Sequence, residues 1–160
     1  MHILNKTKSL QRGFTLIEIL IVIGILAILA TVVLIALNPA RQFAQARDSQ
    51  RTANVNAILN AIGQRIADNK GLFETGCAAG VIPTTAADMK DTGGYDIAPC
   101  LVPTYLTAMP FDPKGSSCTG SYTSTTAYDT CYSVARDATT GRITVKAPGA
   151  EITTPIEVSR

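Results

Sequence analysis

The chain has no tryptophan and only one histidine, His2, among its 160 residues. If a short N-terminal leader is removed, no imidazole remains for a Ser-His or Cys-His nucleophile. The sequence also lacks an H-E-x-x-H pattern, a P-loop and a glycine-rich dinucleotide turn. We therefore expect a protein that is not an enzyme and that needs no cofactor.

Charged residues are also few, at 16% of the chain. Residues 1–13 hold three of the 14 Lys+Arg and none of the 12 Asp+Glu, which leaves 11 basic against 12 acidic residues. A nearly neutral chain lacks the positive surface that phosphate backbones attract. We therefore do not expect nucleic acid as a main partner.

A local basic set nevertheless follows the N-terminal apolar run. We expect its members to contact lipid head groups or to pair with nearby carboxylates. The arginines are Arg41, Arg47, Arg51 and Arg65, and the carboxylates are Asp48 and Asp68.

The apolar run over residues 14–37 contains one charged residue, Glu18. Its 24 residues are enough to cross a hydrocarbon core of about 30 Å as a helix. A carboxylate within such a span costs roughly 2.5–3.5 kcal/mol at the bilayer centre, less near an end, and usually marks a functional site. A free amine on Phe14 would be its nearest partner if the chain were cut before that residue.

The residues Gly13-Phe14-Thr15-Leu16-Ile17-Glu18 resemble the processing site of type IV prepilins and pseudopilins. The resemblance implies that a membrane-embedded peptidase removes residues 1–13, that Phe14 is N-methylated, and that Glu18 sets the register between subunits. It implies a helical filament of identical subunits as the product, with membrane platform and motor proteins as further partners. The precursor would lie in the cytoplasmic membrane with its C-terminal head outside, and the assembled filament would be extracellular or at the cell surface.

Two alternatives remain open at this stage. The protein could be a pseudopilin of a type II secretion system, or a membrane-anchored extracellular binding module whose helix is only a tether. The second alternative predicts no cleavage after Gly13 and tolerance of Glu18→Ala.

A second helical pattern follows over residues 40–69, with an apolar stripe at three- and four-residue spacing. Asn38-Pro39 predicts a kink before it, and Asn69-Lys70-Gly71 predicts its end. We expect domains at 1–13 (leader), 14–37 (membrane helix), 38–70 (amphipathic helix) and 71–160 (head). The stripe is Val55, Ile58, Leu59, Ile62 and Ile66, and the charged residues of this helix are expected to lie mostly off it.

The head is predicted to be a small antiparallel sheet packed on residues 50–68, which gives an α+β fold. Alternating residues over 130–136 and 142–147 predict a hairpin, with residues 121–128 as a further strand. Residues 71–120 read as a long irregular segment with short elements. Within it, the P-x-D-P run of residues 110–113 resembles a turn that precedes the sheet in pilins and secretion pseudopilins.

Four cysteines, Cys77, Cys100, Cys118 and Cys131, indicate disulfides in an oxidising compartment. They allow three connectivities; we prefer sequential pairing, 77–100 with 118–131. Their spacings of 23, 18 and 13 lack the close pairs of zinc sites, so no metal is expected there. Calcium is a minor alternative around Gly93-Gly94, where the acidic residues are Asp88, Asp91 and Asp96.

Overall fold

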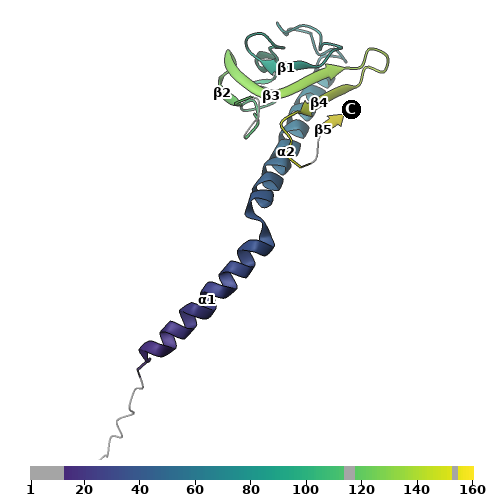
Figure 1. The fold of residues 1–160 in the computed structure, drawn as a ribbon. Helices are drawn as coiled ribbons and strands as arrows, with labels where there is room; N and C mark the ends of the chain where they lie inside the picture. The colour runs from purple at the N-terminus through teal and green to yellow at the C-terminus, as the bar shows by residue number, and fades with distance from the viewer. Residues whose placement is uncertain (1–12, 114–117, 153–154) are drawn as a thin grey trace, which may run out of the picture. The chain divides into compact units, whose positions relative to one another are not determined.

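The computed structural model describes residues 13–113, 118–152 and 155–160, apart from the side chains of residues 36 and 37. The chain divides into two compact units, Met1–Pro39 and Ala40–Arg160. The first contains one helix, and the second contains a helix on a small sheet (Figure 1). The α+β fold class predicted from the sequence is thus confirmed.

The first unit contains helix α1, Leu16–Leu37. Over Leu16–Ile35 it is long and apolar enough to cross a membrane, and none of that stretch is buried within the chain. After Leu37 the backbone of Asn38 adopts a left-handed conformation with φ 38°, and the next helix begins at Pro39. Proline tolerates the first position of a helix because its missing N–H has no partner there. The helical run is therefore interrupted at the Asn-Pro pair, as the sequence predicts.

Helix α2, Pro39–Asp68, continues into the second unit. It ends where Lys70 and Gly71 take positive φ values of 57° and 91°. The Gly71 N–H then donates to the carbonyl of Ile66 at 2.8 Å, which satisfies one of the last helical acceptors. The predicted helix end is confirmed.

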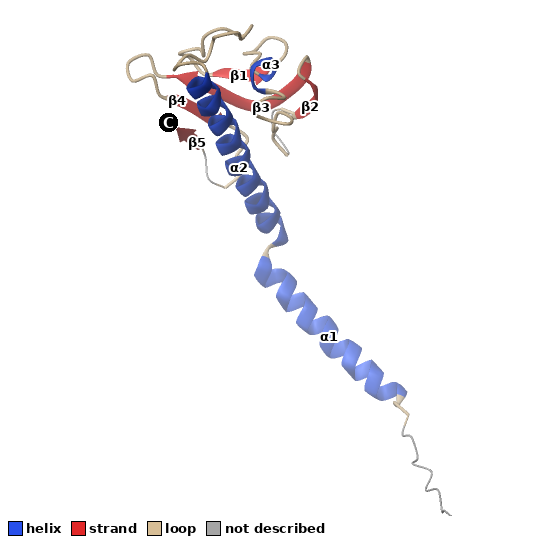
Figure 2. Ribbon diagram, turned by 180° about the vertical axis from the view of Figure 1, so that it is seen from behind, coloured by secondary structure: helices blue, strands red, loops and turns tan. Residues whose placement is uncertain are grey.

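The sheet of the second unit is wholly antiparallel, with strand order β1-β3-β4-β5 and β2 paired to β3. Figure 2 shows α2 against this sheet, with the short helix α3, Ala98–Leu101, near β1. The strands are β1 (Ala87–Lys90), β2 (Ser121–Ser124), β3 (Ala127–Arg136), β4 (Ile143–Ala147) and β5 (Ile156–Ser159).

The predicted hairpin is present as β3 and β4, with Arg136 opposite Ile143. The predicted strand over 121–128 is instead a second hairpin, because the chain turns after Ser124 and β3 starts at Ala127. Strands β1 and β5 were not predicted as strands. Each has only four residues, which is too short for an alternating pattern to stand out.

The core lies between α2 and the sheet. The α2 side chains of Val55, Ile58 and Ile62 are fully buried, as are Tyr132 and Val145 of the sheet. A two-stranded hairpin alone is marginal in water, and packing against a helix makes a small sheet stable. The buried face of α2 supplies that apolar surface here.

Charged residues of α2 also lie on this buried face, and here the sequence prediction was wrong. Asp48, Arg51 and Arg65 are 7%, 0% and 8% exposed. Counting back from Val55 by four and seven residues gives Arg51 and Asp48, so they continue the same helical stripe. The polar end of the stripe is buried because it meets polar partners in the head.

Candidate assembly segment and its supporting head

A capping box marks the N-terminal end of α1. Thr15 is the N-cap, with extended φ and ψ of −86° and 150°, and its hydroxyl accepts a hydrogen bond from the Glu18 N–H at 3.2 Å. In return, Glu18 Oε2 accepts from the Thr15 N–H and from the Thr15 hydroxyl, both at 3.0 Å. Two N–H groups that the first helical turn leaves unpaired are satisfied in this way.

This geometry separates the helix from the Gly13–Phe14 peptide bond. Both residues lie outside the helix, and Phe14 is 82% exposed. The Gly13–Phe14 bond therefore precedes the extended N-cap Thr15 and lies outside the regular helix. The same capping box holds the Glu18 carboxylate at the helix N-terminus, where the positive end of the helix dipole favours an anion.

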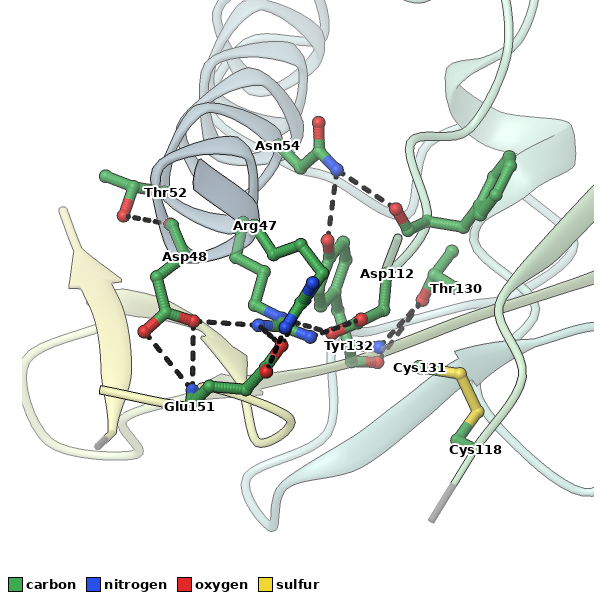
Figure 3. Close-up of polar contacts among 12 residues, drawn as sticks. Arg47, Asp48, Thr52, Asn54, Asp112, Cys118, Thr130, Cys131, Tyr132 and Glu151 are labelled. Carbon is green, nitrogen blue, oxygen red and sulfur yellow. Dashed lines mark hydrogen bonds and ion pairs between the residues drawn. A yellow bond between two sulfur atoms is a disulfide. The ribbon is translucent and has the colours of Figure 1, made fainter. Parts of the chain in front are cut away.

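In the head, Arg51 lies at the centre of an ion-pair cluster that we call the Arg51 cluster: Arg47, Asp48, Arg51, Asp112 and Glu151. Figure 3 labels its members Arg47, Asp48, Asp112 and Glu151. Arg51 donates to both oxygens of Asp112 at 2.8 Å. It also donates to Asp48 at 2.7 Å and to Glu151 at 3.0 Å. The cluster therefore joins α2 to the predicted P-x-D-P turn and to the segment before β5.

Backbone donors complete the cluster. Asp48 accepts from the N–H groups of Glu151 and Ile152, at 2.9 and 2.7 Å. A buried charge is tolerated only when it is paired and its remaining hydrogen-bond capacity is filled. The cluster meets that condition.

Charge pairing shifts the acid–base equilibria of the cluster. The hydrogen bond from Arg47 lowers the pKa of Glu151 to about 2, and Arg51 adds to the effect. The hydrogen bonds to Asp112 raise the pKa of Arg51 above its already high ordinary value. Both shifts favour the charged forms of Glu151 and Arg51.

A second buried arginine closes the far end of α2. Arg65 donates to the carbonyls of Phe73 and Cys100 at 2.9 Å and of Thr75 at 2.6 Å. Its guanidinium also lies 5.4 Å from the centroid of the Phe73 ring. The expected pairing with Asp48 holds for Arg51. Arg47 pairs instead with Glu151, and Arg65 donates to backbone carbonyls of the irregular segment.

The two disulfides have the sequential connectivity that the sequence favoured. Cys77 is bonded to Cys100, with Cα atoms 5.3 Å apart, and Cys118 to Cys131, with Cα atoms 5.8 Å apart. The first closes a loop of the irregular segment, and the second joins β3 to the chain before β2. All four cysteines are therefore structural.

The acidic residues around Gly93-Gly94 do not converge as a metal cluster would. Asp91 accepts from the Thr92 N–H, Asp96 accepts from the hydroxyl of Tyr128, and Asp88 lies beside Lys90. Within residues 13–113, 118–152 and 155–160, one group of three potential ligands is close enough for an ion: Cys118, Asp129 and Cys131. Its two sulfurs form a disulfide, so they are not thiolate ligands.

Two members of the Arg51 cluster, Asp112 and Glu151, were not singled out from the sequence. The available signal for Asp112 was the P-x-D-P run, which gave a turn but no partner. The signal for Arg51 was its spacing from Val55. Glu151 had no local signal, because only the fold brings it to α2.

Comparison with known families gives one match: residues 8–34 match the family described as the prokaryotic N-terminal methylation motif. No curated protein and no solved structure matches the chain. The matched residues cover the Gly13–Glu18 segment and most of α1. The methylation motif, together with the apolar N-terminal helix, supports a type IV pilin-like prepilin.

Proposed function

We propose that this protein is the structural subunit of a type IV pilus-like filament. The observation that carries the proposal is the methylation motif placed on an exposed apolar helix whose first turn holds a carboxylate. An apolar helix without internal burial needs either lipid or other apolar helices around it. The membrane surrounds this helix with lipid before assembly, and the filament core surrounds it with other apolar helices afterwards.

Processing would start at the open segment before α1. A prepilin peptidase cuts after Gly13, and N-methylation then modifies the new amine of Phe14. Residues 14–37 anchor the precursor in the cytoplasmic membrane, with the disulfide-bonded head on the oxidising side. Platform and motor proteins from other chains then draw the subunit into a cell-surface filament.

Glu18 would act as the register device during this assembly. In the structure its carboxylate is held by Thr15 of its own chain, within the first turn of α1. After cleavage the carboxylate pairs with the Phe14 amine of a neighbouring subunit. This pairing is favourable in an apolar core because each charge would otherwise be left without a partner.

The test compares Glu18→Ala with Glu18→Gln. Alanine removes both the charge and the return bond to Thr15, whereas glutamine keeps an acceptor for Thr15 and removes only the charge. Both variants should insert and be cleaved, and both should yield few filaments. Thr31→Val is the matched control, since Thr31 lies in α1 and bonds only to the Ala27 carbonyl of its own helix; it should assemble normally.

The measurement is cleaved subunit in the membrane fraction against sheared filaments in the medium, with the mature N-terminus read by mass spectrometry. N-methyl-Phe14 and loss of filaments in both Glu18 variants support the proposal. An intact Met1 would instead support the membrane-anchored binding module. Wild-type filament yields from both Glu18 variants would remove Glu18 from the assembly mechanism.

A further inference from the structure

The basic end of the sheet is defined by three exposed arginines around Ile143. Arg136 faces Ile143 across the β3–β4 pair, and Arg142 precedes it. Arg160 exchanges two backbone hydrogen bonds with Ile143, at 2.7 and 3.0 Å. Sheet pairing thus gathers three cations from three parts of the chain.

The acidic end lies around Tyr128 at the opposite end of β3. The Asp91 N–H donates to the Tyr128 carbonyl at 3.2 Å, and the Tyr128 hydroxyl donates to Asp96 at 2.9 Å. Asp129 follows Tyr128 and pairs with Lys90 in the β1–β3 register. Asp88, whose side chain is 64% exposed, lines the same pocket as Asp129 and is the fourth carboxylate, although its backbone lies opposite Ser133.

Each end also contains the opposite charge, but in the minority. At the basic end, Asp137 accepts three hydrogen bonds from Thr139 and Thr140 of its own turn, and Glu74 lines the same pocket as Arg136. At the acidic end, Lys90 is the one cation among the residues just named. Among the side chains named, the basic end thus has three arginines and two carboxylates, and the acidic end has four carboxylates and one lysine.

The two ends are well separated. Tyr128 and Arg136 are eight residues apart on the continuous strand β3. Between Asp129 and Val134, five residue steps of β3 lie opposite three residue steps of β1, so β3 is bulged there. At about 3.3 Å per extended step, Tyr128 and Arg136 are therefore about 20 Å apart, and Asp88, which lies opposite Ser133, is about 10 Å from Arg136 along the strands. Both separations exceed the Debye length of about 8 Å at physiological salt, so the attraction between the two ends within one head is screened.

The basic end is also hollowed. A groove of about 550 Å³ runs between α2 and this end, and its lining includes Arg160, Ile143 and Gly141. From α2 it is lined by uncharged residues such as Gly63 and Ala67. At the acidic end, by contrast, residues 92–94 form an exposed turn next to Asp91.

We propose that the basic end of one head binds the acidic end of a second copy of this chain. The charge complementarity between two surfaces of the same molecule carries the inference. Because the two surfaces differ, the contact is heterologous. In each pair of heads, one acidic end and one basic end remain unbound, so further subunits can add at both ends and form an open row. The inference rests on the proposed filament function and names the head contact that supports it.

The test uses two charge-reversed full-length chains in detergent micelles. The first carries Arg136→Glu with Arg142→Glu, so that both of its ends are acidic. The second carries Asp88→Lys with Asp91→Lys, so that both of its ends are basic. Asp96 and Asp129 are left in place because they accept hydrogen bonds from Tyr128 and from the Cys131 N–H.

Neither variant should self-associate in sedimentation, whereas their mixture should associate at 50 mM salt and lose at least about tenfold of its affinity at 0.5 M salt. The matched control exchanges the exposed Lys146–Glu157 pair, whose charges lie 2.7 Å apart, and should behave as wild type. Intact disulfides in all chains show that the heads are folded. Self-association of both variants, or no association of the folded mixture, would overturn the proposal.

The same pair in cells separates this contact from the proposed function. Each variant alone should reduce filament yield by about tenfold or more, and co-expression should restore filaments that contain both chains. Full yield from each variant alone would overturn the contact. The mature N-terminus, read separately, tests the proposed function, because an intact Met1 speaks against filament assembly whatever the heads do in micelles.

Discussion

Removal of the Arg51 guanidinium should be the most damaging single change in the head. Arg51 and the Asp112 side chain are both fully buried and joined by two 2.8 Å hydrogen bonds. Arg51→Met leaves the Asp112 carboxylate buried without its cation. Removing one partner of a buried pair costs about 3–5 kcal/mol. Since domains are stable by only about 5–15 kcal/mol, much of the head's stability would be lost.

Two further variants test the cause of that loss. Arg51→Met with Asp112→Asn removes the uncompensated charge and should recover part of the stability, because Asp48 keeps its two backbone donors. Arg142→Met, at an exposed position in the β3–β4 turn, is the control and should change little.

The assay is denaturant unfolding of the full chain in detergent, with both disulfides oxidised and tyrosine fluorescence as the signal. The chain has five tyrosines and no tryptophan, and Tyr132 contacts Asn54 of α2 through its hydroxyl at 3.0 Å. A loss below about 1 kcal/mol for Arg51→Met, within the range of exposed ion pairs, would refute the reasoning. A double variant less stable than the single one would refute it as well.

Three more predictions follow from the head and the processing segment. The pKa of Glu151 is lowered from 4.5 to about 2, so its contribution to the free energy of unfolding is complete above about pH 4.5 and is lost as the pH falls toward 2. The denaturant midpoint of unfolding should therefore decrease between pH 4.5 and 2, and it should decrease less in Glu151→Gln. Replacing both Cys118 and Cys131 with serine should lower the free energy of unfolding by about 3 kcal/mol, measured from the same denaturant curves. Four reactive thiols in the unreduced wild-type protein after denaturation would contradict the disulfide bonding. Gly13→Leu should block leader removal and leave full-length precursor in the membrane, seen by gel mobility, whereas normal filaments from it would speak against the assigned cleavage site.

The sequence was most informative where one local pattern is enough to define an element. The apolar run of α1, its interruption at Asn38 and the end of α2 at Gly71 each depend on residues within one or two turns. The β3–β4 hairpin likewise shows its alternation and its turn within one short stretch. Such elements are predictable because the forces that make them act between neighbours in the sequence.

Contacts between distant segments were the part that the sequence could not give. Glu151 lies 100 residues from Arg51, and Asp112 lies 61 residues from it, so no periodicity links them. β5 was missed for the same reason: its four residues form a strand only because β4 is beside them. Charged residues of α2 were expected to lie mostly off the apolar stripe, although the spacing of Asp48 and Arg51 from Val55 places them on it. For these residues, helical spacing predicted burial better than residue type did, because side chains at three- and four-residue spacing share one face of a helix. In this head, the buried face of α2 packs on apolar strands over most of its length. Nearer the start of α2 it contacts the carboxylates of Asp112 and Glu151. The pairing of Arg51 with Asp112 therefore lets the buried stripe extend beyond the apolar core.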